Sequence, residues 1–324
     1  MLTVSAPHAP VLLAESVAAL DIRPAGTYVD ATFGRGGHTR AILAALGECG
    51  CVVGIDRDPE AIAVARRELA AEPRFHAVHG AFGELSALVT SVIGERAVDG
   101  ILFDLGVSSP QLDEPARGFS FLRDGPLDMR MDTTRGPSAA EWLARVSEAE
   151  LMRIIAEYGE ERFARRVAHA IVTARGEAPI TTTLALAAIV GAAVPTREPG
   201  KHPATRTFQA IRMAVNGELL QVEQGLEQAL GLLSVGGRLA VISFHSLEDR
   251  AVKQFMRRHA DGDPVWRGMP GAPPESLPVL SLVGKAIRPA AAEVATNVRA
   301  RSATLRVARK DRLWSPARRW RGAA

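Results

Sequence analysis

The stretch TYVDATFGRGGHTR, residues 27–40, decides the predicted fold. Its first seven residues read as a short buried strand, and Gly34, Gly36 and Gly37 separate that strand from a helical pattern. Glycines at the end of a strand let the backbone turn tightly and approach a ligand without a Cβ in the way. The stretch therefore predicts a ligand site at the carboxyl end of this strand.

Strand and helix patterns continue to alternate along the chain on either side of the insertion described below. Further buried strands are expected at residues 51–56, 75–80, 98–106 and 236–244, and an edge strand at 303–310. Helices are expected at residues 37–46, 59–69, 84–92, 205–233 and 246–259, the last opening with a capping box of Ser246 and Asp249. Strand and helix in turn predict an α/β fold with a doubly wound, Rossmann-like sheet.

The alternation stops in the middle of the chain. Residues 108–134 are rich in Pro, Gly and Asp and read as a long loop, whereas 138–175 and 181–194 are strongly helical. No strand pattern lies between about residues 110 and 205. We therefore predict an all-helical insertion at 111–205, within a discontinuous α/β domain of residues 1–110 and 206–324.

Composition limits the class of protein. Of 324 residues, 47% are hydrophobic and 23% charged, which is ordinary for a soluble globular chain. The longest apolar run, Leu184–Val194, falls short of the roughly 20 residues of a membrane span, and no secretory signal is evident, so a cytoplasmic protein is expected. Cys49 and Cys51 are too few for a disulfide framework or a zinc site and are interpreted as buried or half-buried free thiols.

The net charge of +3 is distributed unevenly. Residues 285–324 contain 11 Lys and Arg residues against two acids. Such a segment can neutralise phosphates, and Trp314 and Trp320 lie among its arginines, where an aromatic ring can stack on a base. A solvated tail is the alternative, and the balance favours nucleic acid.

The residues around the glycines indicate which ligand is bound. A dinucleotide fingerprint, G-x-G-x-x-G, would need a third glycine where Thr39 stands, and the carboxylate of Asp30 would repel a pyrophosphate. A carboxylate there suits a cation, so the spacing points to S-adenosylmethionine, which carries an ammonium and a sulfonium. Asp56, at the end of the second strand, can accept both ribose hydroxyls. A nicotinamide site and a plain glycine-rich turn with solvated acids are the alternatives.

Two further side chains have one functional and one structural interpretation each. His38 lies in the first helical turn after the glycines, either near the ligand or in packing. Phe82 follows the third strand and either stacks on the adenine or belongs to the core.

The turn after the fourth strand carries the candidate catalytic residues. DLGVSSPQLD begins at Asp104, and Ser108-Ser109-Pro110-Gln111 partly matches the turn of enzymes that methylate exocyclic base amines. Acceptors at such a turn can bind the N–H groups of the amine as it attacks the methyl group. Asp104 is the first candidate for this acceptor and Ser109 the second. Alternatively, Asp104 holds the methionine amine and Ser109 belongs to a plain turn.

Several long motifs resemble one known family over nearly the whole chain. They are HAPVLLAE, DATFGRGGHTRAIL, IDRDPEAIA, ILFDLGVSSPQLDEPARGFSF, DGPLDMRMD, KHPATRTFQAIRMAVN and ISFHSLEDRAVKQFM. With them the sequence resembles the RsmH (MraW) family of bacterial 16S rRNA cytidine N4-methyltransferases. The resemblance implies a class I S-adenosylmethionine-dependent methyltransferase that modifies N4 of a cytidine in the ribosomal decoding region. Carried over by position, the cofactor contacts are Gly36, Gly37, His38, Asp56, Phe82, Asp104 and Gln111.

The RNA side is predicted from the chain that follows the insertion. Lys201, His202, Arg206 and Arg212 stand near the start of a helix, where cations and helical N–H groups suit RNA phosphates. Capping and solvated charge is the alternative for this set. His245 follows the fifth strand and is expected to face the substrate.

The insertion is expected to recognise the substrate, and the partner is 16S rRNA or the small ribosomal subunit. Asp124, Asp128 and Asp132 could hold Mg²⁺, but methyl transfer from a sulfonium needs no metal, so none is expected. The oligomeric state stays open, with a homodimer as one option. The rival functions are a methyltransferase of the same fold acting on another nucleic acid or on protein, and a non-catalytic RNA-binding factor in ribosome assembly.

Overall fold

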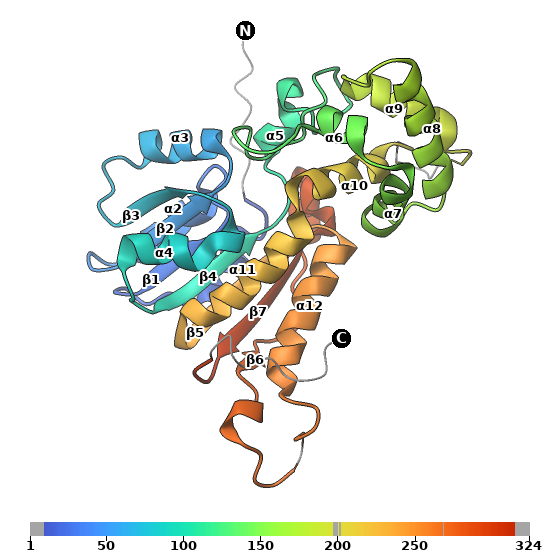
Figure 1. The fold of residues 1–324 in the computed structure, drawn as a ribbon. Coiled ribbons are helices and arrows are strands. Elements are labelled where there is room, and N and C mark those ends of the chain that lie inside the picture. The colour runs from blue at the N-terminus through green and yellow to red at the C-terminus, as the bar shows by residue number, and fades with distance from the viewer. Residues whose placement is uncertain (1–9, 197–199, 201, 268, 315–324) are drawn as a thin grey trace. The chain divides into compact units, whose positions relative to one another are not determined.

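The computed structural model describes residues 10–314 except 197–199, 201 and 268 (Figure 1). It divides into two compact units, and each is described by itself. The sheet unit comprises Met1–Gly106 and Leu219–Ala324, and the helical unit comprises Val107–Glu218. None of the described helices has the length and apolar character needed to cross a bilayer.

The sheet unit is built on a seven-stranded sheet in the order β3-β2-β1-β4-β5-β7-β6. The strands are β1 Thr27–Asp30, β2 Cys51–Asp56, β3 Phe75–His79, β4 Val98–Asp104, β5 Leu233–Ser243, β6 Leu280–Leu282 and β7 Thr304–Lys310. β1 to β5 are parallel, and β7 pairs antiparallel with both β5 and β6. From β1 the chain runs outward to β2 and β3 and then crosses back to β4 and β5 on the other side of β1, so the strand order reverses between β1 and β4.

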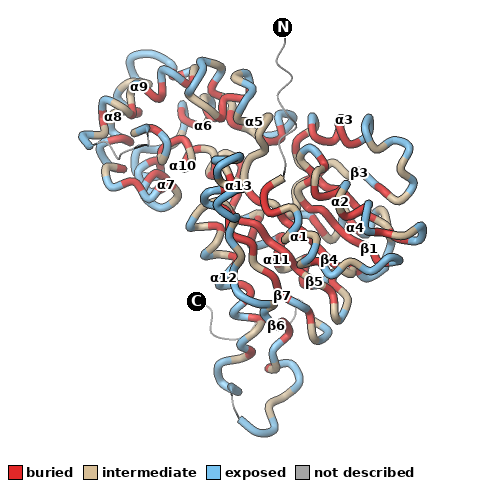
Figure 2. Tube along the Cα trace, turned by 180° about the vertical axis from the view of Figure 1, so that it is seen from behind, coloured by how far each residue is buried: buried red, intermediate tan, exposed pale blue. Residues whose placement is uncertain are grey.

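Helices cover both faces of this sheet (Figures 1 and 2). They are α1 Leu13–Leu20, α2 Gly37–Ala45, α3 Pro59–Glu68, α4 Leu85–Ile93, α11 Glu218–Leu232, α12 Ser246–Asp261 and α13 Ala291–Thr296, with 3₁₀ turns η1 Phe82–Glu84, η3 Pro274–Ser276 and η4 Val298–Ser302. Alternate strand residues enter different cores: Val29 packs with α4, α11 and α12, whereas Tyr28 packs with α1, α2 and α3. The predicted doubly wound α/β fold is confirmed.

The helical unit contains helices and turns in its described residues. They are α5 Ser109–Asp113, η2 Pro115–Arg117, α6 Ala139–Arg145, α7 Glu148–Gly159, α8 Ala164–Glu177, α9 Thr183–Ala193 and α10 Thr205–Asn216. Their apolar faces form one core, for example Leu151, Val167 and Leu186 from three successive helices, all fully buried. The helical unit thus has a core of its own, as an insertion requires.

The boundary of the insertion differs from the predicted 111–205. The helix expected at 205–233 is two helices, because Gly217 ends α10 with a left-handed φ of 59°. α10 belongs to the helical unit, since Phe208 and Ile211 lie in that core and Gln209 donates to the carbonyl of Tyr158. Helical periodicity alone did not distinguish one long helix from two that serve different cores.

Three smaller predictions were wrong. The strand at 303–310 is β7, which lies between β5 and β6 and is therefore not at the edge. The N-cap of α12 is His245 rather than Ser246. Cys49 is exposed, although Cys51 is half-buried as predicted and both are free thiols.

Candidate active site

The predicted acids gather at the carboxyl edge of the parallel strands. Asp30 ends β1, Asp56 ends β2 and Asp104 ends β4. In open α/β sheets the ligand binds outside this edge, at the point where the strand order reverses. That point lies between β1 and β4, so Asp30 and Asp104 flank it and Asp56 is one strand away.

Two threonines that the sequence analysis did not assign hold the turn after β1 in place. Asp30 is fully buried, and its carboxylate accepts hydrogen bonds from the Thr39 hydroxyl (2.7 Å) and the Thr32 N–H (3.3 Å). The Thr32 hydroxyl in turn accepts from the backbone N–H of Asp104 (2.7 Å), which ties this turn to β4. Thr39 occupies the position that a dinucleotide fingerprint gives to its third glycine. A glycine there could not donate the hydroxyl hydrogen bond that Asp30 receives from Thr39. Asp30 acts here as the support of the turn, and its contact with a ligand stays a prediction.

The glycine turn takes the shape that its sequence predicted. Gly34 and Gly36 have left-handed φ values of 55° and 74°, and Gly36 precedes the first turn of α2. The N–H of Gly34 donates to Asp56 Oδ2 at 2.7 Å, so the turn is fastened to β2. At Gly37 space is the constraint, because a Cβ there would lie 2.1 Å from Pro10.

Asp56 is held by backbone on both oxygens. Its Oδ1 accepts from the N–H of Asp58 at 2.9 Å, and its Oδ2 accepts from Gly34. Burial raises the pKa of Asp56 to about 6, and the neighbouring carboxylates of Asp58 and Asp30 push it in the same direction. Each carboxylate oxygen has a second lone pair, so both can still accept from a ligand hydroxyl.

Asp104 and His38 each carry a buried polar atom at this edge that lacks a hydrogen-bond partner among the described residues. Burial raises the pKa of Asp104 to about 6, with the charges of Asp30 and Glu248 adding to the shift and His38 opposing it. His38 Nδ1 lies 3.7 Å from Asp104 Oδ2. Among the described residues, Asp104 Oδ1 and His38 Nε2 are buried without any hydrogen-bond partner. Buried polar atoms in native proteins are normally paired, so these two atoms fit a polar ligand at this edge.

Phe82 is half-buried at the end of β3. Its ring packs edge-on against Phe103, with the centroids 5.5 Å apart. This packing satisfies the structural interpretation, and the stacking on an adenine stays a prediction.

His245 lies just beyond β5 and is engaged by its own helix. Its Nδ1 accepts from the N–H of Glu248 at 3.4 Å, and its Nε2 lies 3.1 Å from Glu248 Oε1. Glu248 is 1% exposed and was missed by the sequence analysis, which treated it as part of an ordinary helix start. Its charge raises the pKa of Asp104, so Glu248 belongs to the electrostatics of the same edge.

The remaining predicted residues belong to the helical unit, where they have local partners. Ser109 begins α5, and Gln111 forms a capping box with Ser108, accepting from its N–H at 3.0 Å. His202 Nδ1 accepts from the N–H of Ala204 at 3.1 Å, and its ring lies 4.7 Å from that of Phe121. Lys201 lies outside the described residues.

The two predicted arginines of α10 are both bound within the helical unit. Arg206 donates to the carbonyl of Glu160, and Arg212 makes a two-pronged ion pair with Glu218 at 2.8 and 2.7 Å. An RNA phosphate at Arg212 would have to compete with this carboxylate.

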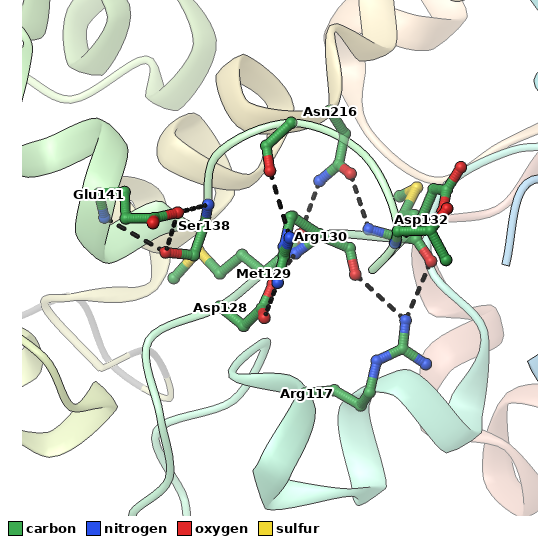
Figure 3. Close-up of polar contacts among 11 residues, drawn as sticks. Arg117, Asp128, Met129, Arg130, Asp132, Ser138, Glu141 and Asn216 are labelled. Carbon is green, nitrogen blue, oxygen red and sulfur yellow. Dashed lines mark hydrogen bonds and ion pairs between the residues drawn. The ribbon is translucent and has the colours of Figure 1, made fainter. Parts of the chain in front are cut away.

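The acids of the loop DGPLDMRMD serve the backbone around them (Figure 3). Asp128 pairs with Arg130, and Asp132 accepts from the N–H and hydroxyl of Thr134. Asp124 accepts from the N–H of Leu184 at the start of α9. The three carboxylates thus have separate local partners.

Met129, in the same loop, is fully buried and has a left-handed φ of 60°. Asn216 holds its neighbourhood by accepting from the Met131 N–H (2.8 Å) and donating to the Met129 carbonyl (2.7 Å). Arg117 donates to the carbonyls of Arg130 and Met131 (Figure 3). These bonds support a backbone conformation that a non-glycine residue rarely adopts.

Comparison with known proteins identifies the family. The model of the MraW methylase family matches residues 5–311. The chain belongs to this family. It is 58% identical over 305 residues to ribosomal RNA small subunit methyltransferase H of Chromobacterium violaceum, covering 94% of this chain and 95% of that protein. The corresponding protein of Idiomarina loihiensis is 54% identical over 314 residues, covering 96% and 99%.

Among solved structures, a putative rRNA-methylase from Clostridium thermocellum covers 94% of this chain and 100% of its own, at 14% identity and a TM-score of 0.45. A likeness this weak adds nothing to the family assignment.

The residues at the carboxyl edge fit the methyl donor of a methylase, S-adenosylmethionine. Three carboxylates with raised pKa values, that of Asp30 fully buried and those of Asp56 and Asp104 half-buried, favour a ligand that brings positive charge, and this donor carries an ammonium and a sulfonium. The unpaired Asp104 Oδ1 offers an acceptor for an N–H donor. The cofactor predicted from the glycine turn thus agrees with the family.

Proposed function

We propose that this chain transfers a methyl group from S-adenosylmethionine to the exocyclic N4 of a cytidine in the decoding region (P site) of 16S rRNA. The observation that carries the methyl-transfer part is Asp104 at the strand-order reversal, with a buried carboxylate oxygen lacking a partner among the described residues. The target is supported by the relatives, which are named ribosomal RNA small subunit methyltransferase H.

Different residues of the sheet unit bind different parts of the donor. The bound donor supplies an electrophilic methyl group on its sulfonium. Asp56 accepts from the ribose hydroxyls and Phe82 packs on the adenine. Asp104 accepts either from the ammonium group of the donor or from the amine of the target. Gly34, Gly36 and Gly37 bring backbone close to the ligand, His38 lies beside Asp104, and Asp30 supports the turn from below.

The exocyclic amine of cytosine is a weak nucleophile because its lone pair is delocalised into the ring. An acceptor for its N–H groups favours attack by localising that lone pair. Asp104 and Ser109 are the two candidates, and the Asp104→Ala variant separates the roles. Weaker donor binding would make Asp104 the donor's anchor and leave Ser109 as amine acceptor, whereas lost turnover with normal donor binding would make Asp104 the acceptor.

We assign recognition of the RNA to the helical unit, in a wider span than the predicted 111–205. Lys201, His202, Arg206 and Arg212 contact phosphates in this proposal, Gln111 contacts the cofactor, and His245 faces the substrate. When RNA binds, Arg206 has to release the carbonyl of Glu160 and Arg212 the carboxylate of Glu218, and each then contacts a phosphate instead. The partner is the small ribosomal subunit, encountered in the cytoplasm, and a homodimer would be detected by light scattering.

The deciding experiment is mass spectrometry of 16S rRNA nucleosides from strains with and without the gene. Loss of an N4-methylated cytidine on deletion, and its restoration when the purified chain and S-adenosylmethionine are added to small subunits from the deletion strain, support the proposal. Intact binding to those subunits without methyl transfer would instead identify a non-catalytic assembly factor.

A further inference from the structure

Helix α12 presents a row of cations on the face turned away from the sheet. Lys253 and Arg257 are four residues apart on this face, Arg258 flanks them, and all three are exposed. The opposite face packs into the core through Val252, Phe255 and Met256. The exposed row is therefore not needed to bury α12.

The acids of α12 do not neutralise this row. Glu248 is buried at the start of the helix, Asp249 pairs with Arg306 at 2.7 Å, and Asp261 pairs with Arg267 at 3.1 Å. Within the described part of the chain, Lys253, Arg257 and Arg258 have no recorded ion pair. Three neighbouring cations without acidic partners give this face a local positive charge.

The loop after α12 carries exposed apolar side chains that follow the cations along the chain. Val265, Trp266 and Met269 are 62%, 37% and 55% exposed. Figure 1 shows this loop extending past the ends of α12 and β6. Large apolar side chains gathered on a protruding loop mark an interaction site more often than single exposed ones do.

Hydrogen bonds fix the conformation of this loop at its base. The N–H of Asp263 donates to the carbonyl of Ser276 at 2.9 Å, and the N–H of Val265 donates to Asp263 Oδ1 at 2.9 Å. The N–H of Trp266 donates to the carbonyl of Asp263. Trp266 is thus presented on an ordered turn, and little conformational entropy is lost when its ring is covered.

The basic C-terminal segment leaves the described structure beside the same helix. Trp314 packs partly buried against the core, edge-on to His259 of α12 with the centroids 6.2 Å apart. Part of the Trp314 ring is therefore used in packing, and its stacking on a base stays a prediction. Residues 315–324, which include Trp320, lie outside the described residues, and their sequence contains Arg318, Arg319 and Arg321 with no acid.

We propose that Lys253, Arg257, Arg258, Val265, Trp266 and Met269, the α12 surface, bind a single-stranded segment of rRNA away from the target cytidine. This inference rests on the proposed function. α12 begins directly after the carboxyl end of β5 and has 16 residues, so the loop lies roughly 24 Å from the catalytic edge. The α12 surface therefore anchors the substrate without touching the reacting atoms.

RNA fits this surface better than another protein or a second copy of the chain. Cations beside an exposed aromatic ring match a phosphate backbone with unpaired bases, because the cations attract the phosphates and the ring stacks on a base. A protein partner would have to bring acidic side chains in the same spacing.

The first test replaces the cations with neutral side chains of similar length, Lys253→Gln/Arg257→Gln/Arg258→Gln. Binding to small subunits from a deletion strain is measured from 50 to 300 mM salt. We expect the slope of log K against log salt to fall by about 2, since each lost phosphate contact removes roughly 0.7 to 0.9. At physiological salt KM for subunits rises about 10- to 100-fold, while kcat and donor binding stay unchanged.

The matched control removes three exposed arginines elsewhere in the sheet unit, Arg66→Gln/Arg67→Gln/Arg96→Gln. The change in net charge is identical, so a general electrostatic effect would appear in both variants. Equal slopes in the two triple variants would overturn the proposal.

The second test addresses the aromatic ring with Trp266→Ala. Loss of one stacked base weakens binding roughly 5- to 150-fold and leaves the salt slope unchanged. Val235→Ala, an exposed apolar residue on β5, is the control.

The outcomes separate the two proposals. If the wild-type chain does not methylate small subunits, the proposed function fails. If it does, but Trp266→Ala and the α12 triple variant bind protein-free 16S rRNA as tightly as their controls, the RNA surface is wrong. Weaker binding to intact subunits alone would then point to a ribosomal protein as the partner.

Discussion

Two groups of aspartates in this molecule have pKa values that are shifted in opposite directions from the ordinary value. At the carboxyl edge of the sheet unit, burial raises the pKa values of Asp56 and Asp104 to about 6. In the loop of the helical unit, the N–H of Leu184 lowers the pKa of Asp124. Burial opposes ionisation of Asp128 there, but its hydrogen bonds with Arg130 prevail and lower its pKa as well.

The difference teaches how to tell a ligand-binding acid from a structural one. The loop acids have a cation or an N–H group of the helical unit as partner, so their charge stabilises the fold. The acids at the sheet edge are buried close to one another, and their charge costs free energy until a cationic ligand arrives. Sequence alone separates the two groups only by position, because the first group ends predicted strands and the second lies in a predicted loop.

The largest effect is expected for Asp104→Asn. Methyl transfer falls about 100- to 1,000-fold because a charged acceptor at the reaction edge is lost. Stability at pH 7 rises by about 1–3 kcal/mol, since the folded state no longer holds a carboxyl whose pKa is about 6 against an ordinary 3.8.

The sign of this gain can be checked by thermal unfolding at several pH values. A carboxyl with a raised pKa contributes its full stability below about pH 4 and loses it as the pH rises through 6. The gain of Asp104→Asn must therefore be absent at pH 4 and grow towards pH 7. A variant less stable than wild type at pH 7 would show that Asp104 is structural.

Asn216→Ala comes next, because it removes a buried amide that holds the loop of the helical unit. Its bonds to the Met129 carbonyl, the Arg212 carbonyl and the Met131 N–H are lost together. We expect a loss of about 2–4 kcal/mol in urea unfolding. Gln209→Ala, which removes an amide of the same helix with one bond to a carbonyl oxygen, is the control and should cost less. Similar losses would mean that the strained loop does not depend on Asn216.

Asp56→Asn tests the ribose contact. The affinity for S-adenosylmethionine should fall roughly 10- to 100-fold, because hydrogen bonds to a charged acceptor are worth about 1.5–3 kcal/mol. Isothermal titration calorimetry measures the change. Asp58→Asn neutralises a carboxylate two residues away, and asparagine still caps α3, so donor binding should be nearly normal. Equal affinities in the two variants would exclude Asp56 from the site.

Asp128→Asn should give the smallest effect and the opposite pH dependence to Asp104→Asn. The partly exposed pair with Arg130 is worth about 0.2–1 kcal/mol at pH 7. A carboxyl with a lowered pKa stabilises the fold above its ordinary value and loses that contribution as the pH falls through its folded value. The deficit of the variant, measured in urea, should therefore shrink towards low pH. If the loss of unfolding free energy is the same at every pH, it comes from packing and not from the charge of Asp128.

Much of the fold could be predicted from local patterns. The five parallel strands and the helices after them follow from short apolar runs, glycines and helical spacing, which act within one element. The break at Gly217 was missed, although a glycine is a common helix-ending signal, because the residues on both sides form good helix. That α10 and α11 serve different cores is visible only in the packing. The position of β7 inside the sheet likewise depends on β6, a strand of three residues that is too short to give a pattern.

For the site, the sequence by itself determined which acids end the strands and that the glycine turn lacks its third glycine. Only the tertiary structure decided that Thr39 bonds Asp30, that Asp104 keeps an oxygen without a partner among the described residues, and that Trp266 rather than Trp314 is exposed. The physical reason is distance along the chain. Strand ends are set by neighbouring residues, whereas burial, raised pKa values and exposed surfaces arise from segments that meet only after folding.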